Sequence, residues 1–195
     1  MVGVSPLELI YDYFEDHVRL AGFVRERRPL TVGILGFLVG GLSVFIAQAL
    51  TNRLHVLSFS WTSLVVVVIW KIVAGFLLAA ILHLILELQG LKGDVVGLFI
   101  LFGLADLAWG LTVPLVLVLK SFSDSNWPVT GAFMLVGFLS LSLKARSLQD
   151  SYRISSGRAW FTLGLPYVAA VALGMLAVSL LVMRLILEAV HAVSS

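Results

Sequence analysis

The sequence contains no cysteine and few charged residues. Asp, Glu, Lys and Arg make up 12% of its 195 residues, against about 25% in soluble domains. The lack of cysteine excludes a disulfide framework, a thiolate nucleophile and a metal site with Cys ligands. The formal net charge of +2 is too small to indicate nucleic acid as a partner.

Apolar residues take the place of the missing charges. They make up 60% of the chain and give it a mean hydropathy of +1.06. They lie in long runs separated by short charged turns, which is typical of a helical membrane protein, because about 20 apolar residues cross the hydrocarbon core. The first thirty residues lack an apolar core followed by a small-residue cleavage site, so we expect no cleaved signal peptide.

These runs predict an all-α fold, a polytopic membrane helix bundle with five transmembrane helices and an N-terminal amphipathic interfacial helix. Residues 1–29 form the cytosolic interfacial segment, and residues 30–195 form one membrane domain. The predicted spans are residues 30–50, 61–86, 95–119, 128–143 and 160–183. The longest polar loop, residues 144–159, separates the last two spans.

The N-terminal helix is predicted over residues 5–28. Residues 5–8 form a capping box with proline at the first helical position. Apolar residues then recur at spacings of three and four, namely Leu7, Ile10, Tyr11, Phe14, Val18 and Ala21. Two interpretations stay open. The apolar stripe lies on the membrane or binds a partner, or it packs against the protein's own cytosolic loops.

Two spans carry residues that shape helix packing. Gly36 and Gly40 stand four residues apart in the first span, a spacing that lets membrane helices approach closely. We expect this side to pack within the monomer rather than to form a dimer. In the third span, Pro114 predicts a kink, because proline removes a helical donor and crowds the carbonyl of Gly110.

Lysine and arginine are distributed unevenly between the two sides of the membrane. With the N-terminus inside, nine fall in the inner segments: Arg19, Arg25, Arg27, Arg28, Lys92, Lys144, Arg146, Arg153 and Arg158. Three fall in the outer segments: Arg53, Lys120 and Arg184. The positive-inside rule therefore predicts a cytosolic N-terminus and an external C-terminus in a cytoplasmic (inner) membrane.

Two ionisable residues interrupt the spans near their middle. Lys71 lies roughly 15 Å from the start of the second span, and Asp106 lies roughly 16 Å from the start of the third, at ~1.5 Å per residue. Burying either charge alone costs at least ~2.5–3.5 kcal/mol. Because adjacent spans run antiparallel, we predict an intramembrane Lys71–Asp106 ion pair. It either fixes the register of the two spans or relays protons or ions, and both hypotheses stay open.

His83 and Glu87 stand one helical turn apart near the inner boundary. This spacing can supply two metal ligands, but the sequence offers no third or fourth, so we predict a hydrogen-bonded interface pair. The sequence contains no P-loop, Ser–His–Asp order, zinc-protease helix or dinucleotide fingerprint. We therefore expect no catalytic residues, no cofactor and no bound metal.

Several short stretches carry a resemblance to a known family. They are residues 75–77 (GFL), 83–84 (HL), 90–94 (GLKGD), 103–105 (GLA) with Pro114, and 152–159 (YRISSGRA). Over roughly residues 61–183 the chain resembles the Yip domain of the Ypt/Rab-interacting membrane proteins and their bacterial relatives. The resemblance implies five spans, a cytosolic N-terminus, no catalytic site and a function in binding other proteins. Residues 1–29 lack the Asp-Leu-Tyr-Gly-Pro-type motif of eukaryotic members, which indicates a bacterial-type member.

We therefore expect a non-enzymatic integral membrane adaptor or accessory subunit. Its partners are membrane lipids and another protein, in the membrane or the cytosol, or a second copy of the chain. Loop 144–159 either presents Arg146, Arg153 and Arg158 to anionic lipid or an acidic partner, or only sets the topology. The alternative is a small transporter or channel component that uses Lys71 and Asp106. A third hypothesis is that helix 5–28 shapes membrane curvature.

Overall fold

The structure, a computed structural model, consists of helices in the residues that it describes. These are residues 17–52, 59–123 and 125–194, with residues 11, 13 and 15. The elements are α2 (His17–Arg27), α3 (Leu30–Leu50), α4 (Trp61–Leu88), α5 (Val95–Asp106), the 3₁₀ helix η1 (Leu107–Leu111), α6 (Thr112–Phe122), α7 (Asn126–Tyr152) and α8 (Ser156–Ser194). The predicted all-α class is confirmed.

Five helical segments are long and apolar enough to cross a membrane. They are Leu30–Leu50, Trp61–Leu88, Val95–Phe122, Asn126–Tyr152 and Ser156–Glu188. The third of them joins α5, η1 and α6 into one continuous span. The prediction of a multi-pass membrane protein with five spans is therefore confirmed in number and order.

The prediction for the fourth span and the following loop is wrong. Residues 144–152 are not loop but the last turns of α7, which runs on to Tyr152. Only residues 153–155 separate α7 from α8. Arg153 ends α7 in the left-handed conformation (φ 53°), a usual helix terminus. The sequence prediction ended the span at Lys144 because of its charge, whereas Lys144 is buried inside the bundle.

The centre of the bundle is α5, which has ten buried residues out of twelve. A helix that is apolar all round is stable only when neighbours cover it on every side. On one side α3 meets it at glycine, since a Cβ atom at Gly36 would lie 2.1 Å from the carbonyl oxygen of Gly103. A Cβ atom at Gly40 would lie 2.7 Å from the carbonyl oxygen of Asp106. The Gly36/Gly40 side therefore packs within the monomer, as predicted.

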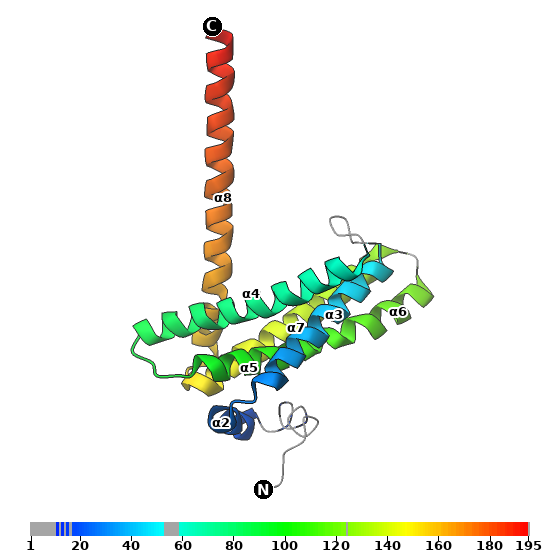
Figure 1. The fold of residues 1–195 in the computed structure, drawn as a ribbon, viewed down its shortest axis with the longest axis vertical. Coiled ribbons are helices and arrows are strands. Elements are labelled where there is room, and N and C mark those ends of the chain that lie inside the picture. The colour runs from blue at the N-terminus through cyan, green and yellow to red at the C-terminus, as the bar shows by residue number, and fades with distance from the viewer. Residues whose placement is uncertain are drawn as a thin grey trace.

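Helix α2 crosses the end of the bundle and packs on α5 (Figure 1). Its buried residues Leu20 and Val24, with Tyr13 before them, form one cluster with Ile100 and neighbouring residues of α5. Tyr11, one residue of the predicted stripe, has a side chain that is 64% exposed. Residues 5–8 and all other residues of the stripe lie outside the residues whose side chains the structure describes. The structure thus supports packing of this segment on the protein itself, although on the bundle rather than on loops.

Helix α8 leaves the bundle after its first turns. Ala159, Thr162 and Leu163 are buried against α4 and α7. From Tyr167 to Glu188 every side chain is exposed. Figure 1 shows α8 running away from the other four spans at a steep angle. Four spans therefore pack together, and the fifth presents its whole circumference outward.

We predict that Gly36→Ala destabilises the fold. The added methyl group would collide with backbone atoms of α5, and overpacking of this kind typically costs ~1–3 kcal/mol. The matched control is Gly131→Ala in α7, where a Cβ atom meets nothing within 4 Å. Thermal unfolding in mild detergent should show a lower midpoint for Gly36→Ala and an unchanged or higher one for Gly131→Ala. Equal midpoints would contradict the close α3–α5 contact.

Candidate functional site

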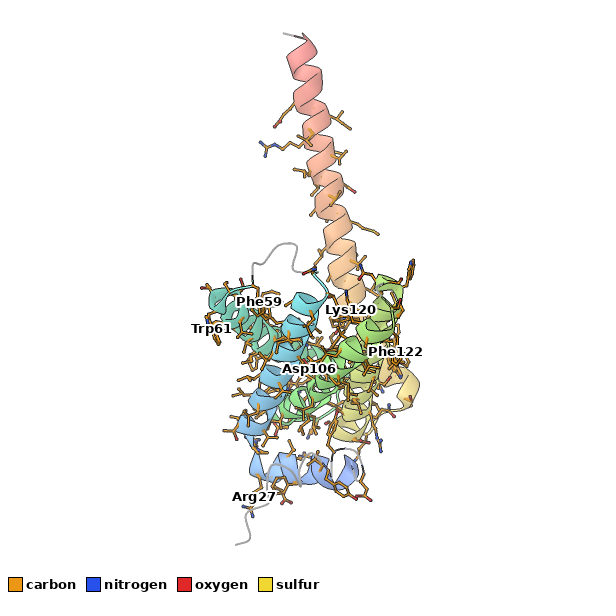
Figure 2. The ribbon with its side chains drawn as sticks, turned by 90° about the vertical axis from the view of Figure 1, so that its right-hand side faces the viewer. Arg27, Phe59, Trp61, Asp106, Lys120 and Phe122 are labelled. Carbon is orange, nitrogen blue, oxygen red and sulfur yellow. The ribbon has the colours of Figure 1, made fainter. Side chains whose placement is uncertain are left out.

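A buried carboxylate marks the centre of the membrane domain. Asp106 is the last residue of α5 and is 1% exposed. Figure 2 shows it inside the bundle, between the end that carries Arg27 and the opposite end that carries Trp61. A carboxylate at this position requires charge compensation from the protein, because neither lipid nor neighbouring apolar side chains can supply it.

Two lysines supply this compensation. Nζ of Lys71 in α4 donates a hydrogen bond to Oδ2 of Asp106 at 2.6 Å. Nζ of Lys144 in α7 lies 2.6 Å from the other oxygen, Oδ1. Ser140, one turn before Lys144, donates to Oδ1 at 3.2 Å. The structure thus brings together the predicted pair of Lys71 and Asp106, and it adds two partners from α7.

The backbone around Asp106 positions its side chain. The helix tightens to the 3₁₀ form directly after it, over Leu107–Leu111. Pro114 explains part of this change, since it cannot donate to the carbonyl of Gly110. The hydroxyl of Thr112 donates to the carbonyl of Trp109 at 2.6 Å and so satisfies another acceptor in the altered turn. The kink predicted at Pro114 stays a prediction, and the structure has a 3₁₀ segment shortly before this residue.

Two adjacent glycines of α3 make room for the cluster. Gly40 lies against the backbone of Asp106, and a Cβ atom at Gly41 would lie 3.5 Å from Cγ of Lys71. Larger residues at either position would push α3 away from the charged groups. The small residues of the first span therefore serve both helix packing and the closure of the charged cluster.

The cluster carries one more positive than negative charge when all three groups are ionised. Aromatic rings lie near both ammonium groups, with Nζ of Lys71 5.2 Å from the Trp109 ring centroid and Nζ of Lys144 6.0 Å from that of Phe102. The negative face of such a ring attracts a cation. The arrangement can lock three helices together, and it also contains the groups that a proton or ion relay requires.

Lys144 and Ser140 were missed as site residues by the sequence analysis. Both lie on the buried face of α7, together with Val136, Ser147 and Leu148. Their spacing of four and three residues follows the helical period. Had this period been continued beyond residue 143, it would have placed Lys144 on the same face as Ser140.

His83 and Glu87 lie close in space, but their separation is longer than the predicted hydrogen bond between them. Nε2 of His83 lies 3.6 Å from Oε2 of Glu87. The other ring nitrogen, Nδ1, lies 2.6 Å from the hydroxyl of Tyr152 at the end of α7. The Tyr152 ring covers Gly93, where a Cβ atom would lie 2.1 Å from it. These contacts join α4, α7 and the α4–α5 turn at one end of the bundle.

The three arginines assigned to the polar loop have different surroundings. Arg146 is an exposed residue of α7, and Arg153 is exposed at its C-terminus. Arg158, in the first turn of α8, donates a hydrogen bond to Oε1 of Gln89 at 2.5 Å. They do not form one flexible basic loop, because the segment that carries them is almost entirely helical.

Other proteins give no guide to this site. Comparison with protein-family models, curated proteins and solved structures finds no match to the chain. Within the described ranges, no three His, Asp or Glu side chains converge as metal ligands. The charged cluster around Asp106 is therefore the strongest candidate site by its chemistry and burial.

We predict that Asp106→Asn is far more damaging than the loss of either lysine. Asp106→Asn leaves two ammonium groups facing each other without a counter-charge, and breaking a buried ion pair in this way costs about 3–5 kcal/mol. Lys71→Met and Lys144→Met each leave a one-to-one pair and should cost less. Chemical unfolding in detergent micelles measures the free energy of unfolding of each variant and so ranks the three losses of stability.

The control for loss of a lysine is Lys120→Met, because Lys120 lies outside the cluster. The double variant Lys71→Met with Asp106→Asn should remain unstable, because Lys144 then has no counter-charge. Full recovery of stability in that variant would mean that Lys144 does not share Asp106.

Proposed function

We propose that this chain is a non-enzymatic integral membrane adaptor or accessory subunit, which binds another membrane protein through α8. The observation that carries the proposal is the exposure of this helix. Its apolar residues from Val168 to Ile186 are exposed, without burial against the other described spans. A span without intramolecular packing is suited to packing against another protein in the bilayer.

The glycines of the chain support this use of α8. Gly36 of α3 and Gly103 of α5 are in close contact with a neighbouring helix. In α8, a Cβ atom at Gly174 would meet nothing within 4 Å. Gly174 follows Ala170 at the four-residue spacing that favours close helix approach. This small face of α8 therefore has the composition of a helix interface but is not covered by any described residue of its own chain.

We place the protein in the cytoplasmic membrane with its N-terminus in the cytosol. Transfer of Lys144 to the bundle interior reduces the inner Lys and Arg residues from nine to eight, against three on the outer side. At the opposite end, Phe59, Trp61, Phe122 and Trp127 are all more than 70% exposed. Aromatic residues are enriched at membrane–water interfaces. These four exposed side chains therefore fit a bilayer boundary at the end of the bundle opposite Arg27.

The resemblance to the Yip domain agrees with this proposal. That resemblance implies a protein that acts by binding other proteins and has no catalytic site. The N-terminal segment packs on the bundle through Leu20 and Val24. Because these side chains are already buried, we propose that this segment is not the main partner-binding element. Partner binding then falls to α8.

The second candidate is a small transporter or channel component. The observation that favours it is the charge excess around Asp106, where two lysines share one carboxylate. Ionisable groups within membrane spans often mark proton or ion pathways. In this alternative, Lys71 and Lys144 exchange Asp106 as partner during transport.

We predict that Gly174→Leu reduces co-purification of a partner several-fold. The larger side chain would prevent close approach at the small face of α8 without disturbing the bundle, because a Cβ atom at Gly174 meets nothing within 4 Å. The measurement is the molar ratio of partner to chain after purification from the native membrane in mild detergent. Gly131→Leu, at an equally open position in α7, should leave the ratio unchanged.

The two functions predict different results for the purified protein. A chain that purifies alone, and that conducts proton-coupled flux in vesicles abolished by Asp106→Asn, would refute the adaptor and support the transporter. A partner at fixed ratio, lost with Gly174→Leu only, would support the adaptor.

We also predict that an engineered cysteine at Phe122 reacts with a membrane-impermeant maleimide in intact cells, whereas one at Arg27 does not. Both positions are exposed, and the sequence has no other cysteine to react. Lysed cells should label both. The reverse pattern in intact cells would invert the orientation.

A further inference from the structure

A cavity lies at the end of the bundle that carries Arg27, apart from the charged cluster around Asp106. It has a volume of about 170 Å³ and lies between α2, the start of α5 and the end of α7. One water needs ~10–15 Å³ of such a volume, so the cavity accommodates a polar group of several atoms. Its position at a bundle end places it where lipid headgroups meet water.

Two arginines contribute to the lining of this cavity from different elements. Arg25 comes from the last turns of α2, and Arg153 terminates α7. Neither guanidinium has an ion-pair partner among the residues that the structure describes. Guanidinium groups bind phosphate through paired hydrogen bonds. The two arginines therefore provide recognition for a phosphate group.

Two carboxylates belong to the same lining, Asp94 and Asp150. Asp94 begins α5, where Oδ1 accepts from the backbone N–H of Val96 at 3.1 Å. Its Oδ2 lies 3.2 Å from Nε of Arg28. These acidic groups disfavour a ligand that carries only negative charge. They favour a ligand whose positive group lies a few atoms from its phosphate.

We propose that this cavity binds the headgroup of a zwitterionic phospholipid with a primary amine, the phosphoethanolamine group. The phosphate contacts Arg25 and Arg153, and the ammonium group faces Asp94 and Asp150. A primary ammonium offers three hydrogen-bond donors, whereas a quaternary ammonium offers none. The site therefore distinguishes ethanolamine from choline by hydrogen bonding and from glycerol headgroups by charge. This proposal is independent of α8 and of the adaptor function.

The test is native mass spectrometry of the full-length purified chain with phosphatidylethanolamine, phosphatidylglycerol and phosphatidylcholine of identical acyl chains. We expect phosphatidylethanolamine to bind at least ten-fold more tightly than the other two. Excess glycerophosphoethanolamine, which has the headgroup but no acyl chains, should displace it. Equal binding of the three lipids, or no displacement, would overturn headgroup recognition.

Variants of the lining residues distinguish the contribution of charge to lipid binding from the contribution of cavity shape. Arg25→Gln and Arg153→Gln, from different helices, should each weaken phosphatidylethanolamine binding at least ten-fold. Asp94→Asn retains an acceptor for the Val96 N–H and should remove the preference over phosphatidylglycerol. Gly22→Leu fills the cavity from α2, where a Cβ atom meets nothing within 4 Å, and should weaken binding of every headgroup.

Arg184→Gln is the matched control, because Arg184 is exposed on α8 and does not line the cavity. Its binding should equal that of the wild type. Unchanged binding in both arginine variants and in Gly22→Leu, or equal loss in Arg184→Gln, would refute the site.

Discussion

The structure depends on the neutralisation of one carboxylate within an apolar bundle. Removing an ion from water costs several kcal/mol even after relaxation, and only close partners with good geometry offset this cost. Asp106 obtains them from α4 and α7, with a 2.6 Å contact to each lysine. The ion pairs thus determine which helices lie beside α5 and at which height, whereas apolar contacts alone would tolerate sliding.

Helix α3 completes this arrangement although it contributes no charge. Its glycines allow its backbone to approach α5 and cover Asp106 from a third side. In lipid, the hydrophobic effect does not drive helices together, so close packing of small residues supplies much of the association energy. The charged cluster and the glycine contact are therefore complementary, one fixing register and the other excluding lipid from the ions.

The sequence predicts the parts of this structure that depend on local physics. Spans are visible from their length and apolarity, and Lys71 and Asp106 from the cost of leaving either unpaired in lipid. Lys144 was missed because a local rule ends a span at a charge, while its burial depends on a carboxylate 38 residues earlier in the chain. The burial of Leu20 and Val24 depends in the same way on contacts with α5 that no local period indicates.

The packing around Asp106 favours a structural role for the charged cluster over a role in relaying protons or ions. A carrier must expose its ionisable group first to one side and then to the other, which requires neighbouring elements to separate. At Asp106 the α3 backbone is in close contact, since an added Cβ at Gly40 would lie 2.7 Å from the Asp106 carbonyl oxygen. Opening this contact would break glycine packing along α3, and separating α4 or α7 from α5 would remove a lysine from the carboxylate. By contrast, α8 is exposed beyond its first turns and makes no such contact with the charged cluster. The fold therefore combines a core of four packed spans, fixed by the charged cluster and the glycine contact, with one span that lies outside this core.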